Sequence, residues 1–244
     1  MCSSEARASD LHSEGRGFES LHAYQNTLRR QRAESLVDST GLINSCPQQG
    51  SIPSRPTKLT NSRFGCDRDE GKTMLNMRAM DHIERTRSYL DYIENHLRNI
   101  EKAWGVLQEK CKDMRFIYDD YVFHEIRGHL EQHDVSKLSP EEFVQYRVKF
   151  YPTEHEDANS ADFAAAWEHH KGENPHHWEN WAATEFFNPY AGEVHCVCMV
   201  ADWMAMGYQF GDTAREYYEK NKDRIELPEW AVRFIHEIFE RVYS

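Results

Sequence analysis

The chain has 244 residues, of which 29 are Lys or Arg and 41 are Asp or Glu, giving a formal net charge of −12. No apolar run approaches the roughly 20 residues of a membrane-spanning helix, the N-terminus lacks the apolar core of a signal peptide, and the acidic balance argues against a general nucleic-acid-binding surface. The six Cys have no zinc-ribbon or CxxC spacing, which is typical of reduced thiols, so we expect a soluble cytoplasmic protein.

The composition changes near residue 76. Residues 1–76 hold 10 basic and 9 acidic side chains and no Trp, whereas residues 77–244 hold 19 basic and 32 acidic side chains and all six Trp. The first segment lacks the apolar periodicity that buries a core, so we predict a disordered extension over 1–76. The folded domain is then expected over 77–244.

A second interpretation of the first segment concerns its translation. A purine-rich string that resembles a bacterial ribosome-binding site can encode Glu70-Gly71-Lys72. Translation would then begin at Met74, Met77 or Met80, and the preceding residues would be a mis-assigned gene start.

The first half of the domain has helical periodicity. A long helix is predicted over 79–110, with six apolar residues on one face: Leu90, Ile93, Leu97, Ile100, Trp104 and Leu107. A second helix is predicted over 117–133, with Val122, Ile126 and Leu130 inward. Ser139-Pro140 is typical of an N-cap followed by proline at the first helical position, so a third helix is predicted from there to about 150.

The second half continues the helical pattern. Helices are predicted over 162–171, from Asn174-Pro175 onward, over 193–208, over 213–222 after an Asp212 N-cap, and over 228–242. The segment 193–208 is strongly apolar and is expected to be the central buried helix. Because no segment alternates with period two, no strand is predicted. The fold class is therefore all-α, a single bundle of about eight helices.

One apparent zinc motif is rejected on its spacing. His124-Glu125 with His129 is similar to HExxH, but the second His comes one residue too late. At about 100° per residue, a five-residue step places it some 140° around the helix. A zincin site is therefore not expected.

The segment His133-Asp134-Val135-Ser136-Lys137 is a better candidate. An imidazole nitrogen and a carboxylate oxygen are ligands that zinc, iron and manganese accept. Lys137, one turn on, is placed to present its ammonium to an anion held by such a metal. A His-Asp pair alone is also typical of a helix cap.

Other positions supply ligands of the same kinds. His96 lies on the long first helix, and two His pairs, 169–170 and 176–177, flank Pro175, which breaks the helix and lets them converge. Asp202 lies within the apolar helix, where a carboxylate is costly to bury unless it is paired or bound to metal. The sequence leaves open which His of the two pairs face inward, and leaves a salt bridge as the alternative for Asp202.

In this order, His96, His133-Asp134, the paired His and Asp202 resemble the HD-domain superfamily of all-helical metal-dependent phosphohydrolases. The HDxxK form and the paired His are similar to its two-metal branch, as is the helix around Asp202. Residues 82–244 also resemble an uncharacterised family of phage and bacterial proteins that carries HDxSK, HHxxxNPHHW and DWMAMG.

The resemblance implies a ligand set and a cofactor. Its metal ligands would be His96, His133, Asp134 as the bridging carboxylate, His170, one of His176 or His177, and Asp202. The cofactor would be one or two divalent ions (Mn, Fe, Zn, Co or Mg), and Asp134 and Lys137 would act in catalysis. Lys171 replaces the Glu that follows the paired His in that branch, and no Gly-Tyr-Pro follows, so cleavage of cyclic dinucleotides is not implied.

The activity implied is hydrolysis of a small phosphorylated substrate, such as a nucleotide, by metal-activated water. The setting would be the cytoplasm of a bacterium or of a phage-infected cell. Two alternatives stay open: a mixed-valent iron pair that activates dioxygen, and a non-catalytic phage accessory protein whose metal only braces the fold.

Overall fold

A computed structural model describes residues 69–182 and 189–244, with side chains described for 76–180 and 191–244. Except for its last eight residues, the extension predicted over 1–76 lies outside these ranges. The chain divides into two compact units after Met80, and the fold and site below belong to the unit Asp81–Ser244. Within the described ranges, no helix combines the length and apolarity that crossing a bilayer requires.

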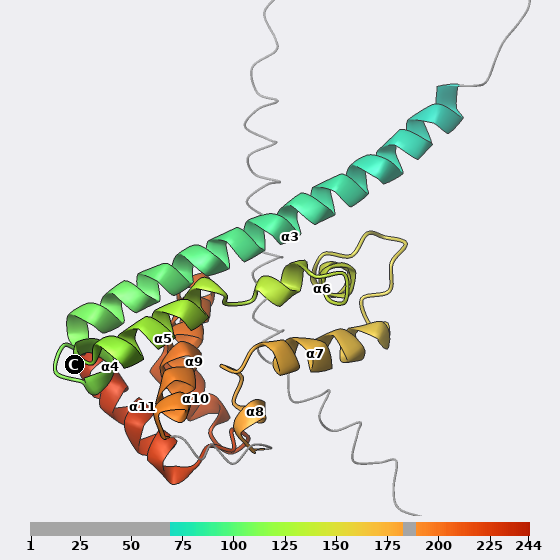
Figure 1. The fold of residues 1–244 in the computed structure, drawn as a ribbon. Helices are drawn as coiled ribbons and strands as arrows, with labels where there is room; N and C mark the ends of the chain where they lie inside the picture. Colours follow the sequence, from blue (N-terminus) through green and yellow to red (C-terminus); the bar gives the residue numbers. More distant parts are fainter. Residues whose placement is uncertain (1–68, 183–188) are drawn as a thin grey trace, which may run out of the picture. The chain divides into compact units, whose positions relative to one another are not determined.

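Residues 69–182 and 189–244 form helices, turns and loops, without a strand (Figure 1). The elements are α3 Asp69–Lys110, α4 Arg115–Tyr118, α5 Asp120–Glu131, the 3-10 helix η1 Val135–Leu138, α6 Phe143–Phe150, α7 Asp162–Glu173, α8 Glu179–Ala182, α9 Pro189–Phe210, α10 Ala214–Asn221 and α11 Glu229–Val242. The prediction of an all-α domain of about eight helices is confirmed.

The long helix α3 ends at Lys110 as predicted but begins at Asp69, ten residues early. Its buried stripe consists of Tyr89, Ile93, His96, Ile100, Ala103, Trp104 and Leu107. Leu90 and Leu97 are 42% and 38% exposed, so their predicted inward placement is wrong. Because an α-helix has 3.6 residues per turn, Tyr89 and His96 lie on the same buried face as Ile93, and Leu90 and Leu97 lie beside it.

Two predicted helices differ in their boundaries. The helix expected over 117–133 is divided at Asp119, whose carboxylate accepts hydrogen bonds from the backbone N–H groups of Tyr121 and Val122 and caps α5. The helix expected from Ser139 begins instead at Phe143. Residues 139–142, which were predicted to be helical, form a turn. In this turn the backbone N–H groups of Glu142 and Phe143 donate to the Ser139 carbonyl at 3.3 and 2.9 Å.

The predicted N-terminal ends of two further helices are also wrong. After Asn174-Pro175 the chain makes a turn, and α8 is a single helical turn. The cap of α10 is Thr213 and not Asp212, because Thr213 forms a capping box with Glu216.

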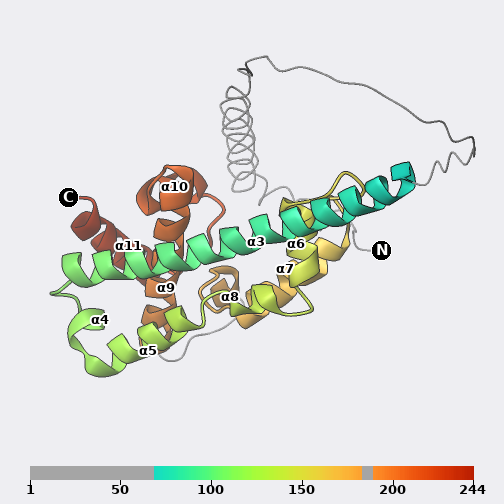
Figure 2. The same cartoon turned by 90° about the horizontal axis from the view of Figure 1, so that it is seen from above.

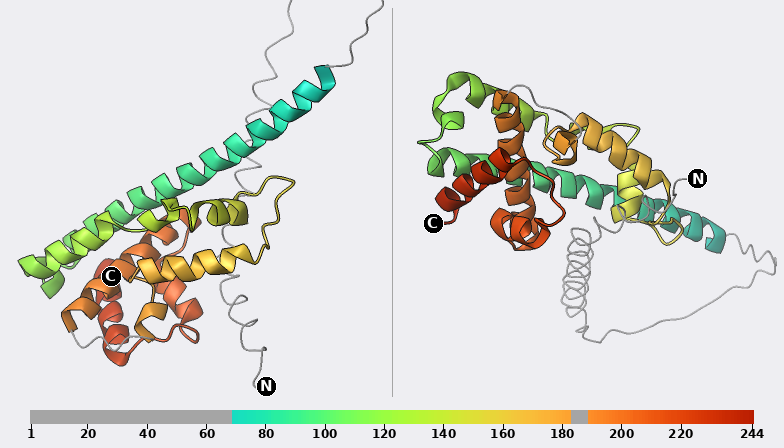
Figure 3. Two further views of the ribbon diagram at one scale, coloured as in Figure 1. Left: turned by 45° about the vertical axis from the view of Figure 1, so that its right-hand side comes forward. Right: turned by 90° about the horizontal axis from the view of Figure 1, so that it is seen from below.

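The central helix is α9, as predicted for 193–208. It contacts α5 on one side and α10 and α11 on the other (Figure 2). A backbone carbonyl of α9, that of Ala205, accepts a hydrogen bond of 3.3 Å from the Asn99 amide of α3. The helices α6 and α7 contact each other and η1 (Figure 3). The elements α3, η1, α7 and α9 therefore meet, and that junction positions the polar groups described next.

Candidate metal centre

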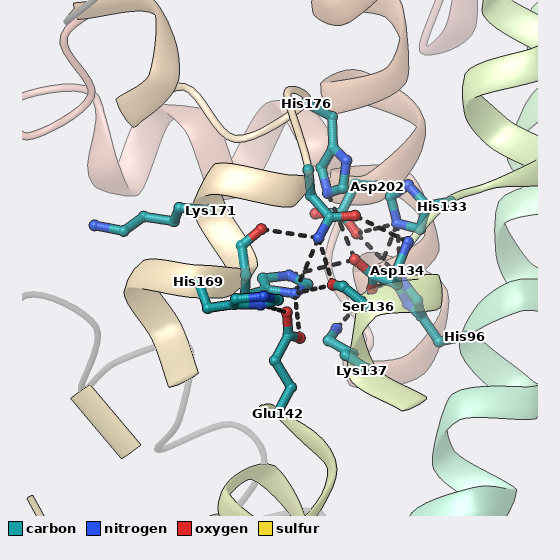
Figure 4. A network of polar contacts seen from close by, with 12 residues as sticks. His96, His133, Asp134, Ser136, Lys137, Glu142, His169, Lys171, His176 and Asp202 are labelled. Carbon is teal, nitrogen blue, oxygen red and sulfur yellow. Dashed lines mark hydrogen bonds and ion pairs between the residues drawn. The ribbon is translucent and has the colours of Figure 1, made fainter. Parts of the chain in front are cut away.

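Buried polar side chains from four parts of the chain converge at this junction (Figure 4). His96 comes from α3, His133 and Asp134 from the turn after α5, His170 from α7 and Asp202 from α9. The side chains of His96, His133, Asp134 and His170 are only 1–3% exposed. All the metal ligands predicted from the sequence lie at this place: His96, His133, Asp134, His170, His176, His177 and Asp202.

The backbone of Asp134 turns the chain between α5 and η1. It has φ 59° and ψ 13°, the left-handed conformation that non-glycine residues rarely adopt. Its backbone N–H donates to Oδ1 of Asn174 at 3.2 Å. In this position the two carboxylate oxygens of Asp134 face different groups of histidines.

We call His96, His133, Asp202 and the Oδ2 atom of Asp134 the first cluster. Nε2 of His96 lies 3.1 Å from Nε2 of His133, and 3.2 Å from both Oδ2 of Asp134 and Oδ1 of Asp202. Nε2 of His133 lies 3.4 Å from Oδ1 of Asp202 and 3.6 Å from Oδ2 of Asp134. Two nitrogens and two oxygens thus face a common point.

These separations fit a metal coordination sphere. Ligand atoms about 2.0–2.1 Å from a zinc ion stand about 3.3–3.4 Å apart in a tetrahedron. The five distances of the first cluster, 3.1–3.6 Å, bracket that spacing. The first cluster therefore has the ligand types and spacing to hold one divalent ion.

We call His170, His176, His177 and the Oδ1 atom of Asp134 the second cluster. Oδ1 lies 3.3 Å from Nε2 of His170 and 3.7 Å from Nε2 of His176, and His177 offers a nitrogen within 4.8 Å of ligand atoms of Asp134 and His170. Within the described part of the chain, Oδ1 of Asp134 and Nε2 of His176 and His177 are buried without a hydrogen-bond partner. Because such atoms cost about 1–3 kcal/mol each, this cluster also fits a cation.

The ionisation states of four cluster residues, His176, His177, Asp134 and Asp202, suit metal binding. Burial lowers the pKa of His176 well below its usual value and lowers the pKa of His177 to about 3, so both imidazoles are neutral at pH 7. Burial opposes ionisation of Asp134 and Asp202. Lys137 and nearby histidines outweigh burial at Asp134, and His133 and His96 outweigh it at Asp202, so both carboxyl pKa values lie well below their usual range. Neutral imidazoles and ionised carboxylates are the metal-binding forms.

His96 shows how the first cluster balances its charge without an ion. Burial lowers the pKa of this imidazole, but its hydrogen bonds with Asp134 and Asp202 have the larger combined effect and raise that pKa. A proton on His96 thus offsets part of the negative charge of the two carboxylates. A divalent ion at the same point would replace that proton.

Lys137 belongs to the same group of residues. Its Nζ donates to Oδ2 of Asp134 at 2.6 Å, and its side chain is 11% exposed. Burial lowers the pKa of this ammonium, but Asp134 outweighs burial and raises it, so Lys137 is charged. The direct partner of the ammonium is therefore the carboxylate that the two clusters share.

Sequence reasoning missed a set of residues behind the second cluster. Glu142 accepts hydrogen bonds from Nδ1 of both His169 and His170, at 2.8 and 2.9 Å. The Asn174 amide nitrogen donates to Oγ of Ser136 at 2.7 Å and to the His170 carbonyl at 2.8 Å. In the sequence, Pro140 and Pro175 indicated only that helices begin near Glu142 and Asn174. No residue pattern indicated the hydrogen bonds that Glu142 and Asn174 form.

The rejected zinc motif lies elsewhere. His124 and His129 are exposed on α5, and the His129 ring contacts that of His195 with centroids 4.9 Å apart. His169, the remaining member of the paired histidines, is 35% exposed and faces Glu142. Of the two His pairs, the structure thus places His170, His176 and His177 at the clusters and His169 outside them.

The comparisons with known proteins give one match. Residues 85–241, which include both clusters, match the family of unknown function DUF5662. No curated protein and no solved structure matches the chain. Because the match spans more than half of the sequence, the chain belongs to the DUF5662 family.

Proposed function

We propose that this protein is a metal-dependent phosphohydrolase of the HD type, acting on a small phosphoester such as a nucleotide. The observation that carries the proposal is the placement of Asp134, which presents one oxygen to each of two histidine clusters. A shared carboxylate between two sets of imidazoles is the arrangement that holds two divalent ions close together. The resemblance in residue order, from His96 to Asp202, supports the same assignment.

The residues that would hold the ions follow from the two clusters. His96, His133 and Asp202 would hold one ion, and Asp134 with His170 and His177 would hold the other. His176 has ligand atoms close to both His133 and Asp134 and would complete the second site from Oδ1 of Asp134, 3.7 Å away. When bound, such ions lower the pKa of a coordinated water and polarise a phosphoryl oxygen. Mn, Fe, Zn, Co and Mg all accept part of this ligand set, since it combines imidazole with carboxylate.

Two residues of the chain support work on a phosphoester. Lys137 supplies a fixed positive charge at Asp134, which would offset the negative charge of a phosphoryl group placed at the clusters. Asp202 is 18% exposed, whereas His96 beside it is 2% exposed. We therefore expect a substrate to approach from the side of Asp202.

The test uses the full chain loaded separately with Mn, Fe(II), Zn, Co or Mg. Each form is assayed with p-nitrophenyl phosphate, bis-p-nitrophenyl phosphate and a panel of nucleotides. We expect hydrolysis of at least one substrate and its loss in the double variant His133→Ala/Asp134→Ala, whose metal content should also fall. The matched control is His124→Ala, an exposed histidine on α5 outside both clusters, which should keep wild-type activity and metal content.

One observation favours a second function, in which the metal only braces the fold. The cluster residues come from distant parts of the chain, and five of them are almost fully buried, as in a structural site: His96, His133, Asp134, His170 and His176. This alternative predicts bound metal and thermal collapse on chelation with no turnover of any phosphoester. Iron with a characteristic optical band and oxygen consumption would instead identify the di-iron alternative.

A further inference from the structure

Glu142 is a buried carboxylate that belongs to neither cluster. It lies just before α6, and its side chain is 0% exposed. Among the described residues, the groups that form ion pairs with it are the imidazoles of His169 and His170, with no Lys or Arg. A carboxylate in such a place is costly unless several donors satisfy it, so its contacts define what it does.

The contacts of Glu142 fix one proton of His170 on Nδ1. An ionised carboxylate has only acceptor atoms, so Nδ1 of His170, 2.9 Å from Oε2, must donate. The Asn174 amide nitrogen and Oγ of Ser136 also lie 3.1 Å from Nδ1, but the two amide N–H bonds have closer acceptors, Oγ of Ser136 at 2.7 Å and the His170 carbonyl at 2.8 Å. Nε2 is then the nitrogen of His170 that remains to face the second cluster.

That nitrogen faces the shared carboxylate. Nε2 of His170 lies 3.3 Å from Oδ1 of Asp134, and the imidazole is 1% exposed. Burial lowers the pKa of this imidazole, but its hydrogen bonds with Asp134 and Glu142 outweigh burial and raise that pKa, so without an ion a proton on Nε2 joins it to Oδ1, and a bound ion would replace that proton. Glu142 therefore prepares His170 to be a ligand, in the manner of carboxylates that orient metal-binding imidazoles.

We propose that Glu142 is a positioning residue, which holds His170 as the Nδ1–H tautomer with Nε2 directed into the second cluster. The inference rests on the proposed function for the identity of what binds there, a divalent ion. The carboxylate is required because it accepts from two donors at once, Nδ1 of His169 through Oε1 and Nδ1 of His170 through Oε2. An amide at this position offers one oxygen to two donors and turns an N–H toward the other.

The consequence is selective for one cluster. Glu142→Gln favours the other tautomer of His170, with the proton on Nε2, which cannot bind a metal. The first cluster should keep its ligands. Its Nε2 and carboxylate oxygen atoms contact one another, within the set of His96, His133, Asp202 and Asp134, and these contacts do not involve Glu142. Loss of an orienting carboxylate weakens metal binding by about 10–100-fold in comparable sites.

The first experiment needs no metal. Long-range nitrogen–proton NMR correlations on the full metal-free chain, recorded at a pH above the pKa of His170, assign the tautomer of its neutral imidazole, with His170→Gln used to identify its signals. We expect the Nδ1–H form in the wild type and the Nε2–H form in Glu142→Gln. The Nε2–H form in the wild-type protein would overturn the inference, whether or not the protein proves to be a phosphohydrolase.

The second experiment measures binding of Mn²⁺ by calorimetry to the full chain. We expect two ions per wild-type chain, and in Glu142→Gln one unchanged ion with the other weakened by about 10–100-fold. Glu142→Asp, which keeps both acceptor oxygens, should restore part of the affinity. His169→Gln is the matched control, because it removes the other partner of Glu142 and leaves His170 bound; it should retain both ions.

The outcomes of the two experiments distinguish a failure of the positioning role of Glu142 from a failure of the proposed phosphohydrolase function. If Glu142→Gln binds both ions as tightly as the wild type, Glu142 does not position a ligand. If two ions bind and respond as described but no phosphoester is hydrolysed, the positioning role stands and the proposed chemistry fails.

Discussion

The side-chain oxygen of Asn174 accepts a hydrogen bond of 3.2 Å from the backbone N–H of Asp134, across 40 positions of the chain. This bond holds a left-handed residue whose carboxylate serves both clusters. Asn174 also contacts Ser136 and the His170 carbonyl, so it joins the turn after α5 to the end of α7. One amide therefore aligns the two segments that supply most of the second cluster.

Replacement of Asn174 should destabilise the domain. Asn174→Ala leaves the buried N–H of Asp134 without its partner, which is expected to lower the free energy of unfolding by about 1–3 kcal/mol. Urea denaturation of the full chain measures the change. Asn95→Ala, an exposed change on α3, is the control and should stay within about 0.5 kcal/mol of the wild type; equal effects for the two variants would contradict this account.

Divalent ions should stabilise the protein through Asp202. At a concentration of about 100 times its dissociation constant, an ion that binds only the folded state adds about 2.7 kcal/mol, or roughly 5–10 °C in Tm for a domain of this size. We expect Mn²⁺ to raise Tm, EDTA to reverse the rise, and Asp202→Asn to remove most of it.

The control for this measurement is Asp113→Asn. It removes a carboxylate from an exposed ion pair with Arg241, and neither residue belongs to a cluster. Its Mn²⁺-dependent rise in Tm should equal that of the wild type. A full rise in Asp202→Asn would show that the ion binds elsewhere.

Two glycines should respond in opposite directions to alanine. A Cβ on Gly207 of α9 would collide with the Asp212 carbonyl oxygen, a backbone atom that cannot rotate away. Gly207→Ala should therefore lower the free energy of unfolding by about 1–3 kcal/mol. Gly105 is exposed within α3 with nothing within 4 Å of its would-be Cβ, so Gly105→Ala should raise it by about 0.5–1 kcal/mol. Thermal and urea unfolding of both variants check the signs.

His195 should make stability depend on pH. Burial, with a contribution from His129, lowers the pKa of this imidazole to about 4, whereas in the unfolded chain it is about 6.5. Between these values the unfolded state binds more protons, so stability rises with pH from 4 to 6.5 and this contribution is constant above. The expected loss between pH 7 and pH 4.5 is about 1–2 kcal/mol after allowance for solvent screening.

The test of the pH effect compares unfolding curves of the wild type and His195→Gln from pH 4.5 to pH 8. The variant should lose less stability than the wild type as the pH falls below 6.5. Parallel curves for the two proteins would exclude His195 as the source.

The sequence predicted the helices, and it singled out the His and Asp residues that the fold brings together, because both depend on local patterns. Val122, Ile126 and Leu130 face inward as their spacing requires. On α3 the same reasoning failed for Leu90 and Leu97, because it counted apolar residues only. The buried stripe of α3 includes a polar residue, His96, which is buried because it contacts the carboxylates of Asp134 and Asp202 from other parts of the fold.

The residues that support the site could not be predicted. Glu142 and Asn174 act through hydrogen bonds to residues 28 and 40 positions away, and no local periodicity encodes such partners. Similarly, the pattern around Ser139 indicated a helix N-cap, whereas the chain uses that turn to place Glu142 behind His170.

His96 and Asp202 meet although they are 106 positions apart in the chain. During synthesis, the first histidine of the site therefore emerges long before its carboxylate partner, and no fragment that ends before Asp202 can assemble the first cluster. A fragment that ends before Asp202 would expose His96 on a helix whose buried face has no complete α9 to cover it. Assembly of the first cluster thus reports that α9 has joined α3 and the turn after α5, and an ion that binds there would follow this step in time-resolved refolding experiments.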